Sequence, residues 1–484
     1  MSLNPSVIFG LKLKKFREMR GLTITEFAAL CELSPMYLTE LEKGSKYPKP
    51  DKIHRIAKAL GRSYEDLISP KLTEEFAPLE DFLNSPILAN FPFHLFGISL
   101  KDLVDMLTRS PAQVSALLKA LLNIAESHHL QLEDLFRVAL RAYQESKLNY
   151  FEDIEDAVEE LIRNYGPNSS LEHLNKLLRE LYDYKIDFEH LSRYPELLIY
   201  RSVYLDLSSP RLLVNPALSL PQKRFVLARE LGYQFLGLKE RAWTFVPEQA
   251  SSFEQVLNDF KASYFAGALL INKEQILADL KRLFEMPNWD YRELLALVEK
   301  YDATPEMLFY RISELVPTFL GLKLHFLRYN FEEGQIRLVK QLNTAHFTVG
   351  LSMSEHHCRR WAVLRYLKKL AREVGKKGRY IFAGAQLSKF VDSEKQFLCL
   401  SIASSSPLRQ GTLSSVAIGL YQDESLERQV KFLADKTIPR IQVGTSCERC
   451  PLRDCQERAA EATVLLNLEQ RRKRINLLKL LRQE

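Results

Sequence analysis

The N-terminal region carries a run of helix-start and helix-stop signals that leaves few folds open to it. Residues 9 to 20 are expected to form a helix, because their apolar side chains recur at helical spacing and Gly21 suits a left-handed helix end. Thr23 followed three positions later by Glu26 makes a capping box, so a second helix starts there and ends near Cys31. Short helices with separate caps predict a small all-helical domain.

A third helix follows after a short turn. Ser34 is its expected N-cap and Pro35 takes its first helical position. Leu33 is placed to pack on Leu38 as a hydrophobic staple. Two short helices joined in this way form a helix-turn-helix, whose second helix can enter a major groove. A module used only for protein contacts would have the same caps, but residues 1 to 70 hold twelve lysines and arginines against eight acids, which favours a polyanion.

Residues 10 to 68, which include "LTITEFAALCELSPMYLTELEKG" and "IAKAL", resemble the Cro/repressor-type (XRE) helix-turn-helix family over the whole module. The resemblance implies a five-helix DNA-binding domain at residues 1 to 70. It implies contacts to double-stranded DNA by the following residues: Ser34, Pro35, Met36, Thr39, Glu40, Lys43, Lys46 and Tyr47. Ile24 and Glu40 stand where the family often has glutamines, and a carboxylate at Glu40 can accept from cytosine N4.

Residues 71 to 165 are expected to form a helical domain, because apolar residues recur three and four positions apart over most of the segment. The stretch "NYGPNSS" at residues 164 to 170 interrupts this pattern with Gly, Pro, Asn and Ser. A new domain is expected to begin just after it.

The stretch "RFVLARELGYQFLG", residues 224 to 237, has the apolar rhythm of a buried helix around a glutamate. In a zinc-peptidase helix two histidines four positions apart bind Zn²⁺, and the glutamate between them polarises the metal-bound water. Arg229, Glu230 and Tyr233 occupy those positions here. An arginine cannot release its proton to bind a cation, and a tyrosine replaces imidazole poorly, so catalysis is expected to be lost.

Together with "NDFKASYFAGALLI" at residues 258 to 271, this helix resembles the ImmA/IrrE-type metallopeptidase fold. The resemblance implies a degenerate zincin-like domain at residues 166 to 315, with Asp259 or Lys261 nearest to the family's acidic third ligand. A cleft that has lost its metal can still hold a small molecule, which makes Arg229, Glu230 and Tyr233 the expected ligand-binding residues. Alternatively, Glu230 is a surface or salt-bridged residue paired with Arg229 or Lys239.

Residues 316 to 484 alternate between strand and helix patterns and predict an α+β sensor-like domain with a basic helical tail. The predicted helix covers residues 355 to 373. The predicted strands are "KLHFLRYN", "GQIRLVKQL", "FTVGLSM", "RYIFAGAQL", "QFLCLSIASS" and "SVAIGLYQD".

Three cysteines gather near the C-terminus. Cys447, Cys450 and Cys455 form a C-x₂-C-x₄-C arrangement, in which two thiolates can approach one ion and a third follows in a short loop. The cofactor is unknown: zinc and an iron-sulfur cluster both suit this pattern, and so do three reduced thiols without a metal. The candidates for a fourth ligand are Cys358, Cys399, His356 and His357.

The order of these parts, with the closing "CERCPLRDCQERAA", resembles the short-chain fatty acyl transcriptional regulators. The resemblance implies control of carbon or acyl-CoA metabolism genes in response to a small-molecule effector. Two modules about 34 Å apart would double the base contacts, so a homodimer is expected. The rival functions are a metallopeptidase that cleaves a repressor and an assembly scaffold.

The whole chain is therefore expected to be multidomain, mainly α with a C-terminal α+β part. It has no signal peptide core and no long apolar run, so a cytoplasmic protein without membrane contact is expected. Six cysteines in 484 residues are too few for a disulfide scaffold.

Overall fold

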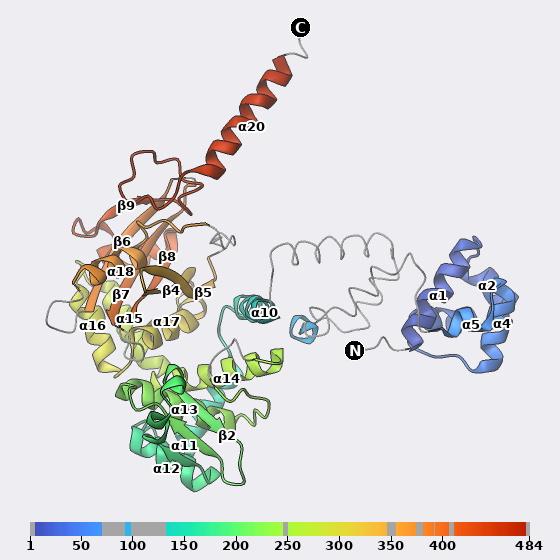
Figure 1. Ribbon diagram of the computed structural model, residues 1–484, viewed down its shortest axis with the longest axis horizontal. Helices are drawn as coiled ribbons and strands as arrows, with labels where there is room; N and C mark the ends of the chain where they lie inside the picture. The colour runs from blue at the N-terminus through green and yellow to red at the C-terminus, as the bar shows by residue number, and fades with distance from the viewer. Residues whose placement is uncertain are drawn as a thin grey trace. The chain divides into compact units, whose positions relative to one another are not determined.

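The computed structural model of the protein (Figure 1) divides into two compact units, Met1–Tyr143 with Ala250–Val256, and Gln144–Gln249 with Leu257–Glu484. The structure describes residues 5–69, 92–97, 132–244, 250–345, 355–373, 381–391, 393–405 and 411–480. Much of the predicted helical domain at residues 71 to 165, and the predicted strand at residues 347 to 353, lie outside the described residues. The four domains expected from the sequence, and the three boundaries between them, remain predictions.

The N-terminal five helices of the first unit follow the caps that the sequence predicts. Thr23 Oγ1 accepts from the Glu26 amide, whose carboxylate accepts from the Thr23 amide in return. Ser34 Oγ accepts from the Tyr37 amide at 3.2 Å. Buried side chains such as Phe9 form one core. The elements of this unit are α1(Pro5–Met19), α2(Ile24–Cys31), α3(Pro35–Glu42), α4(Pro50–Leu60), α5(Tyr64–Ile68), η2(Phe93–Phe96) and most of α10(Leu132–Ser146).

Two contacts fix α1 against α3. Gly10 lies so close to the Leu41 and Glu42 carbonyl oxygens that a Cβ at this position would overlap the backbone of α3. Arg17 Nε and Nη2 donate to the two Glu42 carboxylate oxygens at 2.6 and 3.0 Å, and both side chains are largely buried. The orientation of α3 therefore depends on α1 as well as on its own turn.

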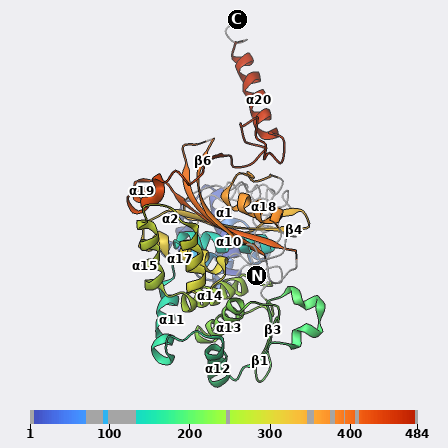
Figure 2. The same cartoon turned by 90° about the vertical axis from the view of Figure 1, so that its left-hand side faces the viewer.

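The helical part of the second unit is held by a buried ion network. Arg311 on α17 is fully buried and donates to both oxygens of Glu155 on α11, at 2.6 and 2.9 Å, and to Glu314 at 3.0 Å. The same part of the unit has a three-stranded sheet of order β1-β3-β2, and Figure 2 shows β1 and β3 near α12 and α13. The elements are α11(Glu152–Tyr165), α12(Leu171–Tyr182), β1(Lys185–Asp187), η3(His190–Arg193), η4(Pro195–Ile199), β2(Ser202–Leu205), β3(Arg211–Val214), α13(Leu220–Phe235), α14(Phe253–Leu270), α15(Lys273–Glu285), α16(Tyr291–Lys300) and α17(Pro305–Phe319).

The remainder of the second unit is built on a six-stranded sheet of order β5-β4-β8-β7-β6-β9, antiparallel except between β6 and β9. Five of the six strands predicted from the sequence are present among the described residues. The elements are β4(Leu324–Glu332), β5(Gln335–Asn343), α18(Ala362–Glu373), β6(Ile381–Phe390), β7(Gln396–Ser405), β8(Leu413–Tyr421), α19(Glu424–Gln429), η6(Lys431–Ala434), β9(Arg440–Val443) and α20(Thr463–Leu480).

The helix predicted at residues 355 to 373 starts later than expected, at Ala362. Residues before it run extended, because their backbone pairs with the cysteine segment: the Cys447 amide donates to the His356 carbonyl, and the Cys358 amide donates to the Thr445 carbonyl. This pairing brings two regions about 90 residues apart in the sequence side by side.

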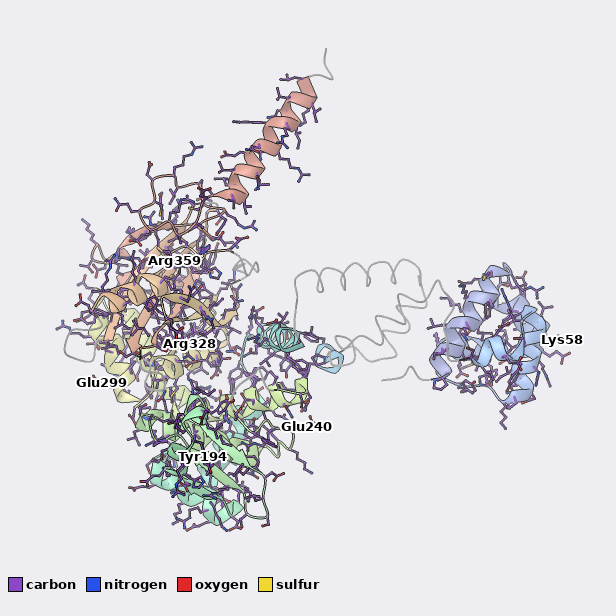
Figure 3. The ribbon with its side chains drawn as sticks, in the orientation of Figure 1. Lys58, Tyr194, Glu240, Glu299, Arg328 and Arg359 are labelled. Carbon is purple, nitrogen blue, oxygen red and sulfur yellow. The ribbon has the colours of Figure 1, made fainter. Side chains whose placement is uncertain are left out.

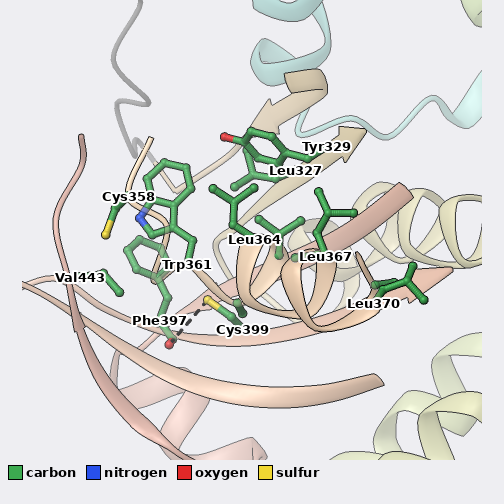
Figure 4. Packing of buried hydrophobic residues seen from close by; sticks show 14 of the residues in the cluster. Leu327, Tyr329, Cys358, Trp361, Leu364, Leu367, Leu370, Phe397, Cys399 and Val443 are labelled. Atoms are coloured by element: carbon green, nitrogen blue, oxygen red, sulfur yellow. Dashed lines mark hydrogen bonds between the residues drawn. The ribbon is translucent and has the colours of Figure 1, made fainter. Parts of the chain in front are cut away.

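The strand periodicity of two divides the sheet into two covered faces. Leu327 and Tyr329 on β4 point to α18, where they join Trp361 and Leu364 in one hydrophobic cluster (Figure 4). The alternate residue Arg328 points to α17. Both faces are therefore buried, which explains the nearly continuous apolar runs of the central strands.

Candidate functional site

The eight residues expected to contact DNA gather on α3 and the turn after it. Met36 is 75 % exposed and Tyr47 is 47 % exposed. Ser34, Pro35 and Lys43 are also exposed. The expected contact residues therefore lie on the solvent side of α3 and of the turn after it, where a partner can reach them.

Within this surface Glu40 has an ionic partner. Lys46 Nζ lies 2.7 Å from the Glu40 carboxylate, and Thr39 Oγ1 donates to the Pro35 carbonyl. The pair neutralises a carboxylate that would otherwise repel phosphate, so both side chains can approach a nucleic acid together.

Glu230 on α13, the remnant of the zinc-peptidase pattern, is completely buried. Arg241 Nη1 and Nη2 donate to its two carboxylate oxygens at 2.7 and 2.8 Å. The Arg241 guanidinium also lies 3.6 Å from the ring centroid of Tyr204 and 4.1 Å from that of Tyr233. A guanidinium between two aromatic faces is thus the cation that Glu230 contacts.

Arg229 and Tyr233, which replace the two histidines, both turn to Asp259 on α14. Arg229 Nη1 lies 3.1 Å from Asp259 Oδ1, and Tyr233 Oη donates to the same oxygen at 3.2 Å. Of the two candidates for the family's third-ligand position, Asp259 and Lys261, it is therefore Asp259 whose side chain contacts α13. The three expected ligand-binding residues lie together, but each already has a partner within the protein.

The interpretation of Glu230 as a surface residue is wrong, and the salt-bridged interpretation is confirmed. Arg229 Nη2 lies 3.7 Å from Glu230, as expected, whereas no ion pair to Lys239 is found in the described part of the chain. Arg241 was not anticipated, because it follows α13 in an irregular segment without periodicity.

The electrostatics keep Glu230 ionised. Burial raises the pKa of Glu230, but the charges and hydrogen bonds of Arg241 and Arg229 outweigh burial, and the pKa ends below its usual value. Burial raises the pKa of the Tyr233 phenol far above its usual value, so that group stays protonated. A carboxylate held by two guanidiniums accepts a proton less readily than a free one.

A second charged cluster, which sequence analysis missed, adjoins α13. Arg328 Nη1 and Arg201 Nη2 lie 2.6 and 3.6 Å from the Glu306 carboxylate. Lys340 Nζ lies 3.3 Å from the ring centroid of Tyr310. Figure 3 shows Arg328 where the six-stranded sheet meets the helices. We call Arg201, Arg328, Lys340 and Glu306 the cationic cluster.

The cationic cluster carries more positive than negative charge. Burial raises the pKa of Glu306, but Arg328, Arg201 and Lys340 outweigh it and lower the pKa to about 2. Burial lowers the pKa of Lys340 to about 8. The charges of Arg229 and Asp259 also act on Arg201, which places the cluster next to α13. Arg201, Arg328 and Lys340 thus share Glu306 as a common acidic partner, while Asp259 also acts on Arg201 and Glu314 on Lys340.

The three C-terminal cysteines share a small cavity with a fourth. Cys358, Cys447, Cys450 and Cys455 all line a cavity of about 10 Å³. Cys399 lies elsewhere, beside Ser388. His356 pairs with Glu448, and His357 with Tyr329. Of the four candidates for a fourth ligand, Cys358 is the one that lines this cavity, whereas His356 lies at the cysteine segment with its ring on Glu448.

The four sulfurs are a donor set of the type that zinc and iron-sulfur clusters use, but their arrangement is not that of a metal site. The Gly444 amide donates to Cys358 Sγ at 3.4 Å and the Ala459 amide donates to Cys447 Sγ at 3.3 Å. Burial outweighs the amide contact at Cys358 and raises the pKa of that thiol. A Cβ on Gly444 would lie 3.0 Å from Cys450 Sγ. No three acidic, histidine or cysteine side chains stand in metal-ligand geometry among the described residues, so the sulfurs line the cavity without converging on one point.

Two family models match this chain. Residues 13–67 match the helix-turn-helix family and residues 187–313 match the IrrE N-terminal-like domain. These matches cover the N-terminal helices and the region from β1 to α17 that holds Glu230. No helix among the described residues is long and apolar enough to cross a membrane.

An uncharacterised HTH-type transcriptional regulator, y4dJ, from Sinorhizobium fredii is 33% identical over 63 residues, which are 13% of this chain and 82% of that protein. The chain therefore belongs to the helix-turn-helix transcriptional regulators. A Mycobacterium tuberculosis transcriptional regulator is structurally similar at 17% identity and a TM-score of 0.48, over 67% of this chain and 93% of that one. The apo competence regulator ComR from Streptococcus vestibularis is 15% identical at a TM-score of 0.13, over 65% of this chain and 98% of that one.

Proposed function

We propose that this transcriptional regulator reads a specific operator as a homodimer and responds to an anionic metabolite, without peptidase activity. The observation that carries the proposal is the guanidinium of Arg241 on both oxygens of Glu230. This arrangement occupies the carboxylate that a peptidase would need for a metal-bound water. The IrrE-like domain then serves as a receptor rather than as an enzyme.

A cleavage assay tests the absence of peptidase activity. The purified protein is incubated with casein and with a repressor, with added Zn²⁺ and with a chelator, beside a Glu230→Ala variant. We expect no metal-dependent cleavage in any sample. Cleavage that requires both metal and Glu230 contradicts the proposal and supports the rival metallopeptidase.

For the metabolite, the cationic cluster supports an anion, and the resemblance to short-chain fatty acyl regulators suggests a short-chain acyl-CoA. A CoA ester carries several phosphate charges that guanidinium groups bind well. Arg229 and Tyr233, on the neighbouring α13, remain the proposed ligand contacts, and Arg201 and Arg328 join them. Binding would exchange the Glu306 ion pairs for pairs with the ligand.

Selection of DNA fragments from a random pool, followed by titration of ligands, tests the reader and the receptor together. We expect one enriched sequence, with affinity that falls as salt rises. Acetyl-CoA and propionyl-CoA should change the affinity for that sequence. Free CoA, which has the phosphates but no acyl group, is the control that shows which of the two the protein recognises. No enriched sequence contradicts specific reading, and enrichment that no ligand alters contradicts the receptor.

At the C-terminus, we propose that Cys358, Cys447, Cys450 and Cys455 would hold a zinc ion or an iron-sulfur cluster. A zinc ion would supply structural cross-linking, and a cluster would supply sensitivity to oxidants. Arg458 donates to the Cys447, Cys450 and Leu452 carbonyls and keeps the cysteine loop closed. Elemental analysis and a visible spectrum of anaerobically purified protein distinguish the two, and the absence of stoichiometric metal contradicts the site.

A further inference from the structure

The last helix, α20, stands apart from the rest of its unit. Its residues Thr463–Leu480 include no buried side chain, and in Figures 1 and 2 the helix points away from the six-stranded sheet. The Leu465 amide donates to the Glu448 carbonyl at 3.1 Å, close to the helix start. Beyond Leu466 the structure gives no hydrogen bond from α20 to another part of the described chain. Most helices in proteins are stabilised by packing against other elements, so an 18-residue helix without a buried side chain is a candidate for binding a partner.

The charge of α20 is concentrated in one turn. Arg471, Arg472, Lys473 and Arg474 are consecutive and exposed, and no ion pair to any of them occurs in the described part of the chain. Successive residues of a helix are about 100° apart, so four of them surround almost the whole circumference. Glu469 is the one acidic residue of this helix. The side chains of α20 project on all sides (Figure 3).

The apolar residues of α20 do not form one face either. Leu466 and Leu468 lie before the basic turn, and Leu477, Leu478 and Leu480 follow it, on several sides of the helix. An amphipathic helix that lies on a membrane or in an apolar groove has its charges on the opposite side. That separation is missing here, so a flat surface or a one-sided groove would meet cations wherever it touched the basic turn.

Duplex DNA fits a ring of cations better than a one-sided partner does. A major groove about 12 Å wide accepts a helix of about 10 to 12 Å and places a phosphate strand on either side of it. Basic regions of other DNA-binding folds lie in the groove as continuous helices. Arg471 and Arg474 lie three positions apart and are neighbours on the helix surface, so phosphates that neutralise them would relieve the repulsion between these two like charges.

We propose that α20 is a second DNA-contacting element, which binds phosphates of the duplex through Arg471, Arg472, Lys473 and Arg474 independently of base sequence. The reader on α3 would select the site, and α20 would add affinity without selecting it. The contribution of α20 is measurable on DNA that contains no operator, so it can be tested apart from specific reading.

The test measures how the dissociation constant of the full chain for a random-sequence duplex depends on salt. In the test variant, Arg471, Arg472, Lys473 and Arg474 are all changed to Gln, which preserves helix propensity. The control variant removes the same charge from exposed positions of the same unit: Lys176, Arg179, Lys185 and Arg193 to Gln. Each phosphate contact contributes about 0.9 to the slope of log K against log salt.

We expect the test variant to lower the slope by about two to four and to weaken binding at least tenfold near 0.1 M salt, with little change in the control. Equal effects in both variants would mean that only net charge matters and would overturn the proposal. Competition by poly-glutamate as effective as that of duplex at equal charge would point to an acidic protein and overturn it too.

Two further measurements keep the outcome decisive. Far-UV circular dichroism should be unchanged in the test variant, and if it is not, removal of residues 463 to 484 replaces it, because no residue of α20 is buried. Fragment selection with the test variant should still enrich the same sequence. If the parent protein enriches no sequence, the result contradicts specific reading by α3. If the salt slope of the test variant equals that of the parent protein, the result contradicts the role of α20 alone.

Discussion

Arg241 donates to both carboxylate oxygens of Glu230 at 2.7 and 2.8 Å, inside a pocket of tyrosine rings where a peptidase of this fold would need a metal-bound water. The pair gives Glu230 a structural role beside α13 and the tyrosine rings. Replacing Arg241 leaves the buried Glu230 carboxylate with the longer Arg229 contact at 3.7 Å and the Tyr184 hydroxyl at 3.3 Å, which compensate its charge less well than the two-point Arg241 contact.

Arg241→Ala is therefore expected to lower the free energy of unfolding by about 3 to 5 kcal/mol. The pH dependence should also reverse. In the parent protein the pKa of Glu230 is lower in the folded state than its unfolded value of about 4.3. The ionised group therefore stabilises the fold at pH values above about 4.3, and this stabilisation is lost as the pH falls through the folded-state pKa. In the variant, burial raises that pKa, so the variant should become less stable as pH rises above about 4.3.

Urea unfolding at several pH values measures both effects. Arg292→Ala is the matched control, because Arg292 pairs with Asp290 in an exposed position, where such pairs contribute about 1 kcal/mol or less. A loss in Arg241→Ala no larger than that of the control contradicts the buried-pair account.

Glu40→Gln should change which base the reader prefers. A carboxylate accepts from cytosine N4, whereas an amide donates and accepts in a pattern that suits adenine, so the enriched sequence should shift at one position of each half-site. Loss of the Lys46 pair also frees a cation, which should tighten binding to random DNA. Fragment selection reads the first effect and salt titration the second.

Glu18→Gln is the control for this prediction, since Glu18 lies on α1 outside the reading surface and the charge change is the same. An unchanged selected sequence in Glu40→Gln would place the side chain away from the bases.

Cys358→Ser is expected to remove most of the metal bound by anaerobically purified protein, because its sulfur shares the cavity with Cys447 and Cys450. Cys399→Ser, which alters another buried cysteine outside that cavity, should leave metal content unchanged. Elemental analysis of both variants decides. Equal metal content in the two would mean that Cys358 is no ligand.

Binding of an anionic ligand at the cationic cluster should weaken as pH rises through about 8, the pKa of Lys340, because deprotonation removes one of its three cations. Isothermal titration of acyl-CoA between about pH 7 and 9 measures the change, and loss of one charge contact corresponds to roughly 1 kcal/mol or more. Lys340→Gln should flatten the profile, while exposed Lys323→Gln should not. If the dependence of ligand affinity on pH is the same in Lys340→Gln as in the parent protein, the ligand does not bind at the cationic cluster.

The N-terminal helices could be predicted in detail because the signals that set them are local. Thr23 with Glu26, and Ser34 with Pro35, act within a few residues, so the sequence order itself carries the geometry. The period-two strands of the C-terminal sheet were equally local.

The sites depend on contacts between distant parts of the chain, and here prediction from sequence was limited. The Arg229, Glu230 and Tyr233 pattern indicated a lost metal site, but Arg241 comes from an irregular segment that no periodicity describes. Cys358 was one of four candidates, and the choice required the pairing of residues near 357 with residues near 446.

Arg328 and Lys340 looked like ordinary strand residues in the sequence. They form the cationic cluster only because β4 and β5 lie against α17, where Glu306 and Tyr310 stand. Their burial, which shifts the pKa of Lys340, follows from the tertiary packing and leaves no trace in local composition.

The guanidinium beside Glu230 is covalently part of the chain and holds its proton at any pH in a cell. A zinc ion in the same place would come and go with the metal supply and with competing chelators. The contact between Arg241 and Glu230 therefore does not depend on the supply of any ion from outside the chain.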